Sequence, residues 1–197
     1  VADDLTVKMS GPNTPGLREL QQDEALRRLR GEVLAERSRA SVRVAVFLKI
    51  APDLDEQALD SICKVVLATD LDAMIVSNTT ISRDAVKGLL NSGETGGLSG
   101  RPLFALATQR LAQVRLRVGD LPLIGVGGIH SAKSAVAKFA AGADAIQLYS
   151  ALVFGGMELL EDIKQGLVQA VRQSGGKTVA DLTGSDVEAW AKGKASL

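Results

Sequence analysis

Two apolar segments end in residues that suit the binding of an anion: LPLIGVGGI at 121–129 and ADAIQLYSA at 143–151. In a barrel of alternating strands and helices, the loops that follow the last two strands commonly form a phosphate site. Gly125, Gly127 and Gly128 let backbone amides approach an anion, and the start of a following helix adds a partial positive charge. The segments therefore favour a phosphate-bearing ligand, although the same glycines also fit an ordinary strand-to-helix turn.

Lys49 is a lone charge at the end of an almost unbroken apolar run, VRVAVFLKI at 42–50. An unpaired buried ammonium would cost several kcal/mol. We therefore expect Lys49 to face an anion or a strong hydrogen-bond acceptor. The alternative is a side chain that leaves the end of the strand and reaches water.

Asn78 and Thr79 come at the end of another apolar segment, AMIVSN at 73–78. Barrel enzymes place their chemistry at the carboxyl ends of the strands, so both side chains are candidates for substrate contact. A carboxamide offers a donor and an acceptor together, which suits a planar ring that carries both carbonyl and N–H groups. The sequence Asn-Thr-Thr also fits a helix cap or a turn.

Composition narrows the class of protein. The chain has 197 residues, of which 46% are hydrophobic, so it can bury a substantial core. Lys plus Arg and Asp plus Glu both number 23, so no net charge favours nucleic acid or an acidic membrane surface. The one cysteine, Cys63, excludes cysteine-ligated zinc; we expect a buried, reduced thiol and no metal site. No apolar run reaches the roughly 18 residues that span a bilayer, and no signal peptide is visible.

Hydrophobic periodicity predicts alternating strands and helices along the chain. We expect strands at 5–10, 42–50, 73–78, 121–126 and 144–149. We expect helices at 23–38, after a cap at Asp53 or Asp55, at 103–118, at 131–141 with Ser131 as cap, at 157–173 and around Trp190. A long, glycine-rich connection at 79–101 is of the kind that usually has a function. Repeated βα units of this sort predict a parallel sheet covered by helices.

Six segments occur in an order and spacing that closely resemble class 2 dihydroorotate dehydrogenase. They are MSGPNTPGLRELQ at 9–21, FLKIAPDL at 47–54, IVSNTTISR at 75–83, SGETGGLSGRPL at 92–103, IGVGGI at 124–129 and IQLYSALVF at 146–154. The resemblance implies an FMN flavoprotein that oxidises dihydroorotate to orotate in pyrimidine (UMP) biosynthesis and passes the electrons to a membrane quinone.

The resemblance also implies the fold. We expect an α/β protein, an incomplete TIM (β/α)8 barrel with about five parallel βα units and a C-terminal helical tail. Residues 1–197 would form a single partial FMN-binding domain, equivalent to strands 4 to 8 of the family barrel. The first three strands, and the N-terminal helical pair that admits quinone, are expected to be absent. The full-length family protein would be cytoplasmic and peripheral at the inner membrane.

Site residues follow from the matched segments. The resemblance places Lys49 beside the N1 and O2 edge of the flavin, where positive charge stabilises the reduced ring, and it places Ser77 by the same ring. It makes Asn78, Thr79 and Asn13 contacts of the orotate.

The remaining assignments concern the phosphate-bearing end of the cofactor. The resemblance makes Ser99 and Gly100 FMN contacts. It assigns the phosphate to four further residues: Gly127, Gly128, Tyr149 and Ser150. His130, the only histidine, follows the glycines and suggests a general base. The family uses no histidine there, so we expect a solvated residue at a helix start.

Two residues depart from the family at the reacting end. Gly11 takes the place of the serine that removes the substrate C5 proton, and a general base typically supplies a rate factor of about 10²–10⁴. Ser10 is adjacent, but successive strand side chains point to opposite faces. Lys8 takes the place of an asparagine that touches flavin and substrate; it would crowd the ring or pair with the substrate carboxylate.

These departures leave three hypotheses. The chain is part of a working dehydrogenase, or a catalytically impaired homologue that only binds FMN or orotate, or another phosphate-binding barrel enzyme; the motif spacing disfavours the third. Five strands would leave open sheet edges, so we also expect self-association and weak FMN binding by the isolated chain.

Overall fold

The fold is an α/β sheet of five parallel strands. The structure, a computed structural model, describes residues 2–8 and 23–197, with side chains for 2–8 and 31–197. The strands pair in chain order, β1-β2-β3-β4-β5. Their bounds are Asp4–Lys8 for β1, Ala45–Ile50 for β2, Ala73–Val76 for β3, Leu123–Val126 for β4 and Ala145–Gln147 for β5.

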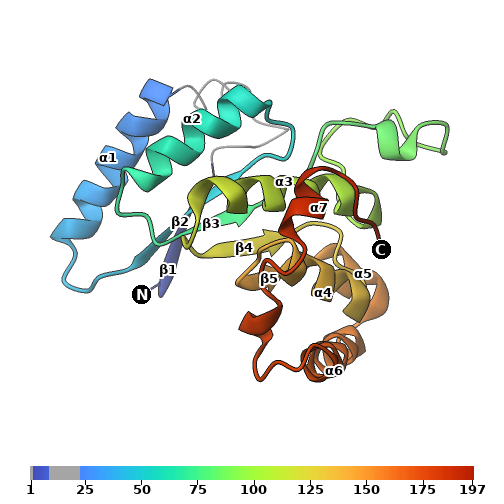
Figure 1. Cartoon of the computed structure of the whole chain (residues 1–197). Helices are drawn as coiled ribbons and strands as arrows, with labels where there is room; N and C mark the ends of the chain where they lie inside the picture. Colours follow the sequence, from blue (N-terminus) through green and yellow to red (C-terminus); the bar gives the residue numbers. More distant parts are fainter. Residues whose placement is uncertain (1, 9–22) are drawn as a thin grey trace.

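Helices connect successive strands and cover the sheet (Figure 1). The α-helices are α1 Asp23–Arg39, α2 Glu56–Leu67, α3 Phe104–Val118, α4 Ala132–Ala140, α5 Ser150–Gly155, α6 Glu158–Gln173 and α7 Val187–Ala191. Because each crossover moves the chain one strand in the same direction, right-handed connections place the helices on one face of the sheet. This arrangement confirms the expected incomplete barrel of parallel βα units.

The sequence explains the central strands and their helices. Strand β2 alternates buried and half-buried residues, with Val46, Leu48 and Ile50 packed beneath the helices. Helix α2 begins where the Asp55 side chain accepts a hydrogen bond from the Ala58 N–H at 2.7 Å. Helix α4 begins at the predicted cap, Ser131, which forms a capping box with Ser134.

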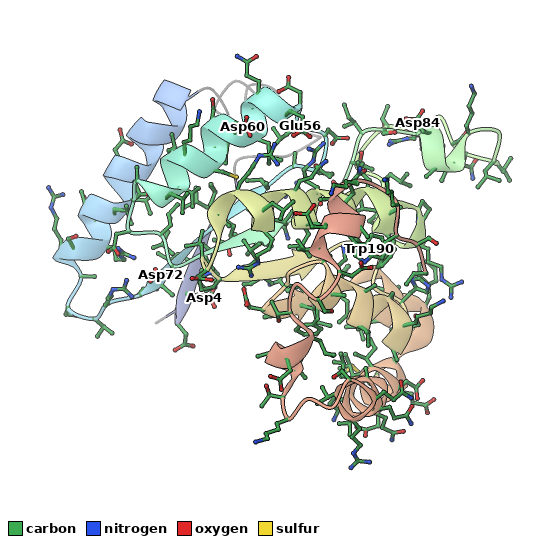
Figure 2. All side chains as sticks on the ribbon, viewed as in Figure 1. Asp4, Glu56, Asp60, Asp72, Asp84 and Trp190 are labelled. Carbon is green, nitrogen blue, oxygen red and sulfur yellow. The ribbon has the colours of Figure 1, made fainter. Side chains whose placement is uncertain are left out.

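The core lies between the sheet and its helices. Cys63 belongs to it as predicted, and burial raises the pKa of its thiol to about 11. The C-terminal helix α7 carries Trp190 (Figure 2) and packs against α3. The Trp190 ring meets the Phe104 ring edge-on at a centroid distance of 5.9 Å. No helix within the described part of the chain is both long and apolar enough to cross a membrane.

Some elements differ from the prediction. The strands are shorter than expected, and residues 9 and 10 of the first lie outside the described residues. Helix α5 was not predicted, because its apolar sequence SALVFG continues the apolar strand segment before it; the helix ends at Gly156, where φ is 66°. Asp53 is not a helix cap: its carboxylate accepts hydrogen bonds from the Thr80 hydroxyl and, at 3.3 Å, from the Ile81 N–H.

Two aspartates stabilise the amino ends of the strands through hydrogen bonds and ion pairs. Asp72, just before β3, accepts the Val46 N–H at 2.7 Å and pairs with Arg37 and Arg43. Asp144, just before β5, accepts the Leu123 N–H at 2.8 Å and pairs with Arg115. Each carboxylate thus joins the start of one strand to the approach of the next and to an arginine.

Candidate functional site

A cavity of about 690 Å³ opens at the carboxyl ends of strands β2 to β5. Parallel strands present their following loops at this end of a barrel, where functional sites lie. Ten of the residues predicted from the sequence line this one cavity: Lys49, Ser77, Asn78, Thr79, Ser99, Gly100, Gly127, Gly128, Tyr149 and Ser150. The structure therefore brings together segments that are up to about a hundred residues apart in the chain.

The glycine turn after β4 packs closely on the start of α3. Gly127 has φ of 102° and Gly128 has φ of 77°, conformations that L side chains rarely adopt. A Cβ on Gly128 would lie 2.4 Å from the Phe104 Cα, and one on Gly127 would lie 2.9 Å from the Ala107 Cβ. Only glycine fits at either position, and within the described residues neither backbone N–H has a hydrogen-bond partner. The turn is therefore a pair of donors suited to an anion.

The start of α5 completes the same wall of the cavity. The hydroxyl groups of Ser99 and Ser150 lie 3.0 Å apart, which joins the long connection to the helix start. Gly100, at φ of 71°, lets the chain pass close to Ser150, whose Cβ would be 3.9 Å from a side chain at position 100. Tyr149 is 80% exposed, so its ring stands at the cavity rim.

Backbone hydrogen bonds fix the polar residues that follow β3. The Ser77 N–H donates to the Val126 carbonyl at 3.3 Å, and the Asn78 N–H donates to the Ile50 carbonyl at 2.8 Å. Ser77 and Asn78 are both buried. Their side chains are therefore held by neighbours on either side of the strand, at the cavity wall.

Lys49 lies at the cavity wall next to a second lysine. Lys8 of β1 is its register partner, and parallel register partners point to the same face of a sheet. Burial, and next the charge of Lys8, lower the pKa of Lys49. The half-buried Lys49 ammonium is thus in an environment that an anionic ligand would stabilise.

The long connection is ordered by its own contacts. Thr80 and Leu98 form an antiparallel bridge between its two arms. The Arg83 guanidinium donates to the Glu94 carbonyl at 2.9 Å and to the Gly96 carbonyl at 2.8 Å. These bonds hold the two arms together before the chain returns to Ser99 and Gly100.

Several residues at or beneath the cavity were not predicted. Arg101 lines it, so a cationic side chain is present at the cavity that the glycine turn also lines. His130 precedes a helix start as expected, but it is half-buried rather than solvated: it lines the cavity, and its Nδ1 lies 2.7 Å from the Gly128 carbonyl oxygen. Lys138 of α4 lies behind the turn, fully buried. Arg101 follows the predicted Gly100, which was a usable signal, whereas no local pattern marks Lys138.

The reacting end of the predicted site is only partly described. Gly11 and Asn13 lie outside the described residues, and Lys8 is exposed at the end of β1. Among the side chains that the structure places, no group of three His, Cys, Asp or Glu residues is arranged to hold a metal ion.

Comparisons with known proteins give a consistent relationship. The family model of dihydroorotate dehydrogenase matches residues 1–171. The chain is 51% identical over 191 residues to the dihydroorotate dehydrogenase (quinone) of Allorhizobium ampelinum, covering 94% of this chain and 53% of the relative. It is 49% identical over 199 residues to that of Agrobacterium fabrum, covering 98% of this chain and 55% of the relative.

Solved structures agree. A ligand-free DHODH from Eimeria tenella superposes with a TM-score of 0.89 at 34% identity, covering 94% of this chain and 56% of that one. The same enzyme in complex with ferulenol gives a TM-score of 0.88, also at 34% identity, with coverage of 94% and 54%. The chain therefore spans about half the length of the relatives it matches. From the family match, the two bacterial relatives and the shared fold, we conclude that this chain belongs to the dihydroorotate dehydrogenase family.

Proposed function

We propose that this chain provides the FMN-binding half of a class 2 dihydroorotate dehydrogenase. The complete protein oxidises dihydroorotate to orotate in pyrimidine biosynthesis and passes the electrons to a quinone. The observation that carries the proposal is that one cavity is lined by ten residues predicted from five separate segments. Residues 1–197 act in it as one partial barrel domain.

The glycine turn fits the phosphate of FMN. Gly127 and Gly128 offer backbone N–H donors where a side chain would collide with α3. The paired hydroxyl groups of Ser99 and Ser150 add donors on the same wall, and Arg101 adds a charge at the cavity. Charged donors strengthen hydrogen bonds to phosphate, so these groups hold the cofactor's anionic end and set its direction across the cavity.

Lys49 and Ser77 fit the ring of the cofactor. When bound, FMN supplies the two-electron acceptor for the oxidation. Lys49 places positive charge at the cavity wall, where it stabilises negative charge on a ligand in a partly desolvated site. Ser77 is held by its backbone bond to Val126, so its hydroxyl stays fixed relative to the glycine turn.

Asn78 and Thr79 orient the substrate beside that ring. Their carboxamide and hydroxyl groups supply donors and acceptors for the carbonyl and N–H groups of a pyrimidine, and Asn13 adds a third contact. Because Asn78 is buried and its backbone is bonded to Ile50, the carboxamide is pre-positioned rather than mobile.

Two residues bear on the rate. Gly11 has no side chain to accept the substrate C5 proton, so water or a neighbouring group must take it. Lys8 adds a second cation beside Lys49, which favours a substrate carboxylate but increases repulsion between the two ammonium groups. We therefore propose a slow enzyme; identity near 50% to proteins described as dehydrogenases favours this over a binding-only homologue.

Quinone access and membrane association belong to the complete protein. We propose that it is cytoplasmic and peripheral at the inner membrane, with quinone reaching the flavin through a region outside this chain. The outer strands β1 and β5 are largely exposed, which suits self-association or completion of the sheet by another segment.

A reconstitution assay tests the function. The chain is joined to the N-terminal half of the Agrobacterium fabrum relative, and dihydroorotate-dependent reduction of a soluble quinone is followed with added FMN. We expect slow turnover that requires both FMN and dihydroorotate. Turnover that is indifferent to dihydroorotate, or FMN that fails to bind, would contradict the proposal. A Lys49→Met chimera is the negative control, because it removes the cation at the ring.

A further inference from the structure

Lys138, in the last turn of α4, has no exposed surface. Its side chain leaves α4 and passes over Gly125, whose missing Cβ would lie 3.5 Å from the Lys138 Cδ. Its Nζ reaches the Val126 carbonyl oxygen at 3.3 Å and lies 5.2 Å from the centre of the Phe104 ring. The amine therefore sits directly behind the glycine turn.

Fold stability does not explain a lysine at this position. Burying an amine with a single carbonyl acceptor carries a desolvation cost, and burial lowers the pKa of Lys138 to about 7. A methionine has nearly the same length and would fill the space without that cost. Residues that are costly for stability are frequently retained for function.

The Val126 carbonyl gives the amine a functional target. The peptide bond between Val126 and Gly127 is trans, so its carbonyl and its N–H point in opposite directions. The carbonyl receives two donors, the Lys138 amine and the Ser77 N–H. The opposite end of the same peptide is the Gly127 N–H, which has no hydrogen-bond partner within the described residues and belongs to a residue that lines the cavity. A donor on the oxygen polarises the peptide and makes its N–H a stronger donor.

The second glycine is tied to the same group of residues. Gly128 packs on the Phe104 backbone, and the Phe104 ring contacts the Lys138 amine. Lys138, Phe104 and the Val126 carbonyl thus form a buried cluster behind both glycines. Movement of the Lys138 amine would therefore change the orientation of the Gly127 and Gly128 N–H groups.

We propose that Lys138 is a positioning residue, which holds and polarises the Val126–Gly127 peptide so that the glycine turn binds the phosphate of FMN tightly. This inference rests on the proposed function, because it takes FMN as the ligand of the turn. Lys138 makes no contact with the ligand; it acts through the peptide.

The test compares Lys138→Met with Lys133→Met, a matched change at an exposed position of the same helix. In the chimera with the Agrobacterium fabrum half, and in both variants made in that chimera, the affinities for FMN and for riboflavin, which lacks the phosphate, are measured by calorimetry. The ¹⁵N shift of the Gly127 amide is recorded without flavin, because it reports hydrogen bonding to the preceding carbonyl. Melting temperatures show whether each variant is folded.

We expect Lys138→Met to weaken FMN binding by about threefold to tenfold, because the Gly127 N–H becomes a weaker and less well-held donor, and to leave riboflavin binding unchanged. The Gly127 signal should move in this variant alone, and its melting temperature should be equal to or above that of the wild type. Equal losses for FMN and riboflavin, or no loss of either, would overturn the inference. Failure of the wild type to bind either flavin would overturn the proposed function; the Gly127 signal then decides separately whether Lys138 holds the peptide.

Discussion

The two ends of the sheet use polar residues in opposite ways. At the amino end, Asp72 and Asp144 are each satisfied by a strand N–H and by arginine partners of the same chain. At the carboxyl end, Gly127, Gly128 and Lys49 line a cavity, and the two glycine N–H groups have no hydrogen-bond partner within the described residues. Groups with internal partners stabilise the fold, whereas groups aimed at a cavity are available for a ligand.

This contrast separates stability from binding in space. Substitutions at the amino end should lower the free energy of unfolding and leave ligand affinity nearly unchanged. Substitutions at the carboxyl end should lower ligand affinity, with or without a loss of stability.

The largest effect concerns the proton acceptor. Replacing Gly11 by serine and Lys8 by asparagine in the chimera with the Agrobacterium fabrum half should raise turnover by about 10²–10⁴, because a general base is restored. Dihydroorotate oxidation rates measure this. The exposed Lys87→Asn serves as the control and should leave turnover unchanged. Equal turnover before and after the double replacement would show that position 11 is not the site of proton removal.

The next effect concerns the glycine turn. Gly128→Ala should weaken FMN binding about 100-fold, because the new Cβ would lie 2.4 Å from the Phe104 Cα and overpacking costs about 1–3 kcal/mol. Gly175 has nearly the same backbone conformation, with φ of 75°, but no atom within 4 Å of a Cβ. Gly175→Ala should therefore lower stability only through its strained backbone conformation, and FMN affinity should be unchanged. Calorimetric titration compares the two, and equal affinities would remove the turn from the binding site.

The amino end provides the third prediction. Burial raises the pKa of Asp72, but the Val46 N–H and the two arginines lower it more, so the net pKa lies below its usual range. The ionised carboxylate therefore stabilises the fold at pH values above the ordinary aspartate pKa. This contribution is lost as the pH falls through the lowered pKa of the folded state. Asp72→Asn should lower stability near pH 7 by about 2 kcal/mol, measured by urea unfolding.

The same variant sharpens the contrast between the two ends. FMN affinity should stay within about twofold of the wild type, because Asp72 is remote from the cavity lining. Asp84→Asn, at an exposed position (Figure 2), is the control for stability. A large loss of FMN affinity in Asp72→Asn would show that the two ends are coupled.

The smallest effect is a pH dependence due to Lys138. Its pKa is about 7 in the fold and rises to its ordinary value on unfolding, so the unfolded chain binds more protons between these values. Wild-type stability should therefore rise with pH above 7, relative to Lys138→Met, by at most about 1.4 kcal/mol per pH unit. Urea unfolding of both proteins from pH 6 to pH 9 measures the difference. A constant difference would mean that the amine is not desolvated.

Much of the architecture could be predicted from the sequence. The apolar runs at 42–50 and 73–78 identify strands that are buried by their neighbours, and Ser131 marks a helix start through its hydroxyl. The ten cavity residues followed from family segments, because each segment carries its own local pattern. Their roles in binding remain predictions.

Other features depend on contacts that no local pattern records. Lys138 occupies what looks like an ordinary helix position; only the fold reveals that it passes over Gly125 and ends behind the turn. Asp53 was a plausible cap, but its partner Thr80 is 27 residues away. Helix α5 was missed because an apolar hexapeptide fits a strand or a helix equally well.

A crystal structure of the chain with FMN would show whether this cavity holds the cofactor. We expect the phosphate within hydrogen-bond distance of the Gly127 and Gly128 N–H groups, with the ring extending toward Lys49. Density for the phosphate at another surface, or a ring turned away from Lys49, would contradict the assignment of this cavity to the cofactor.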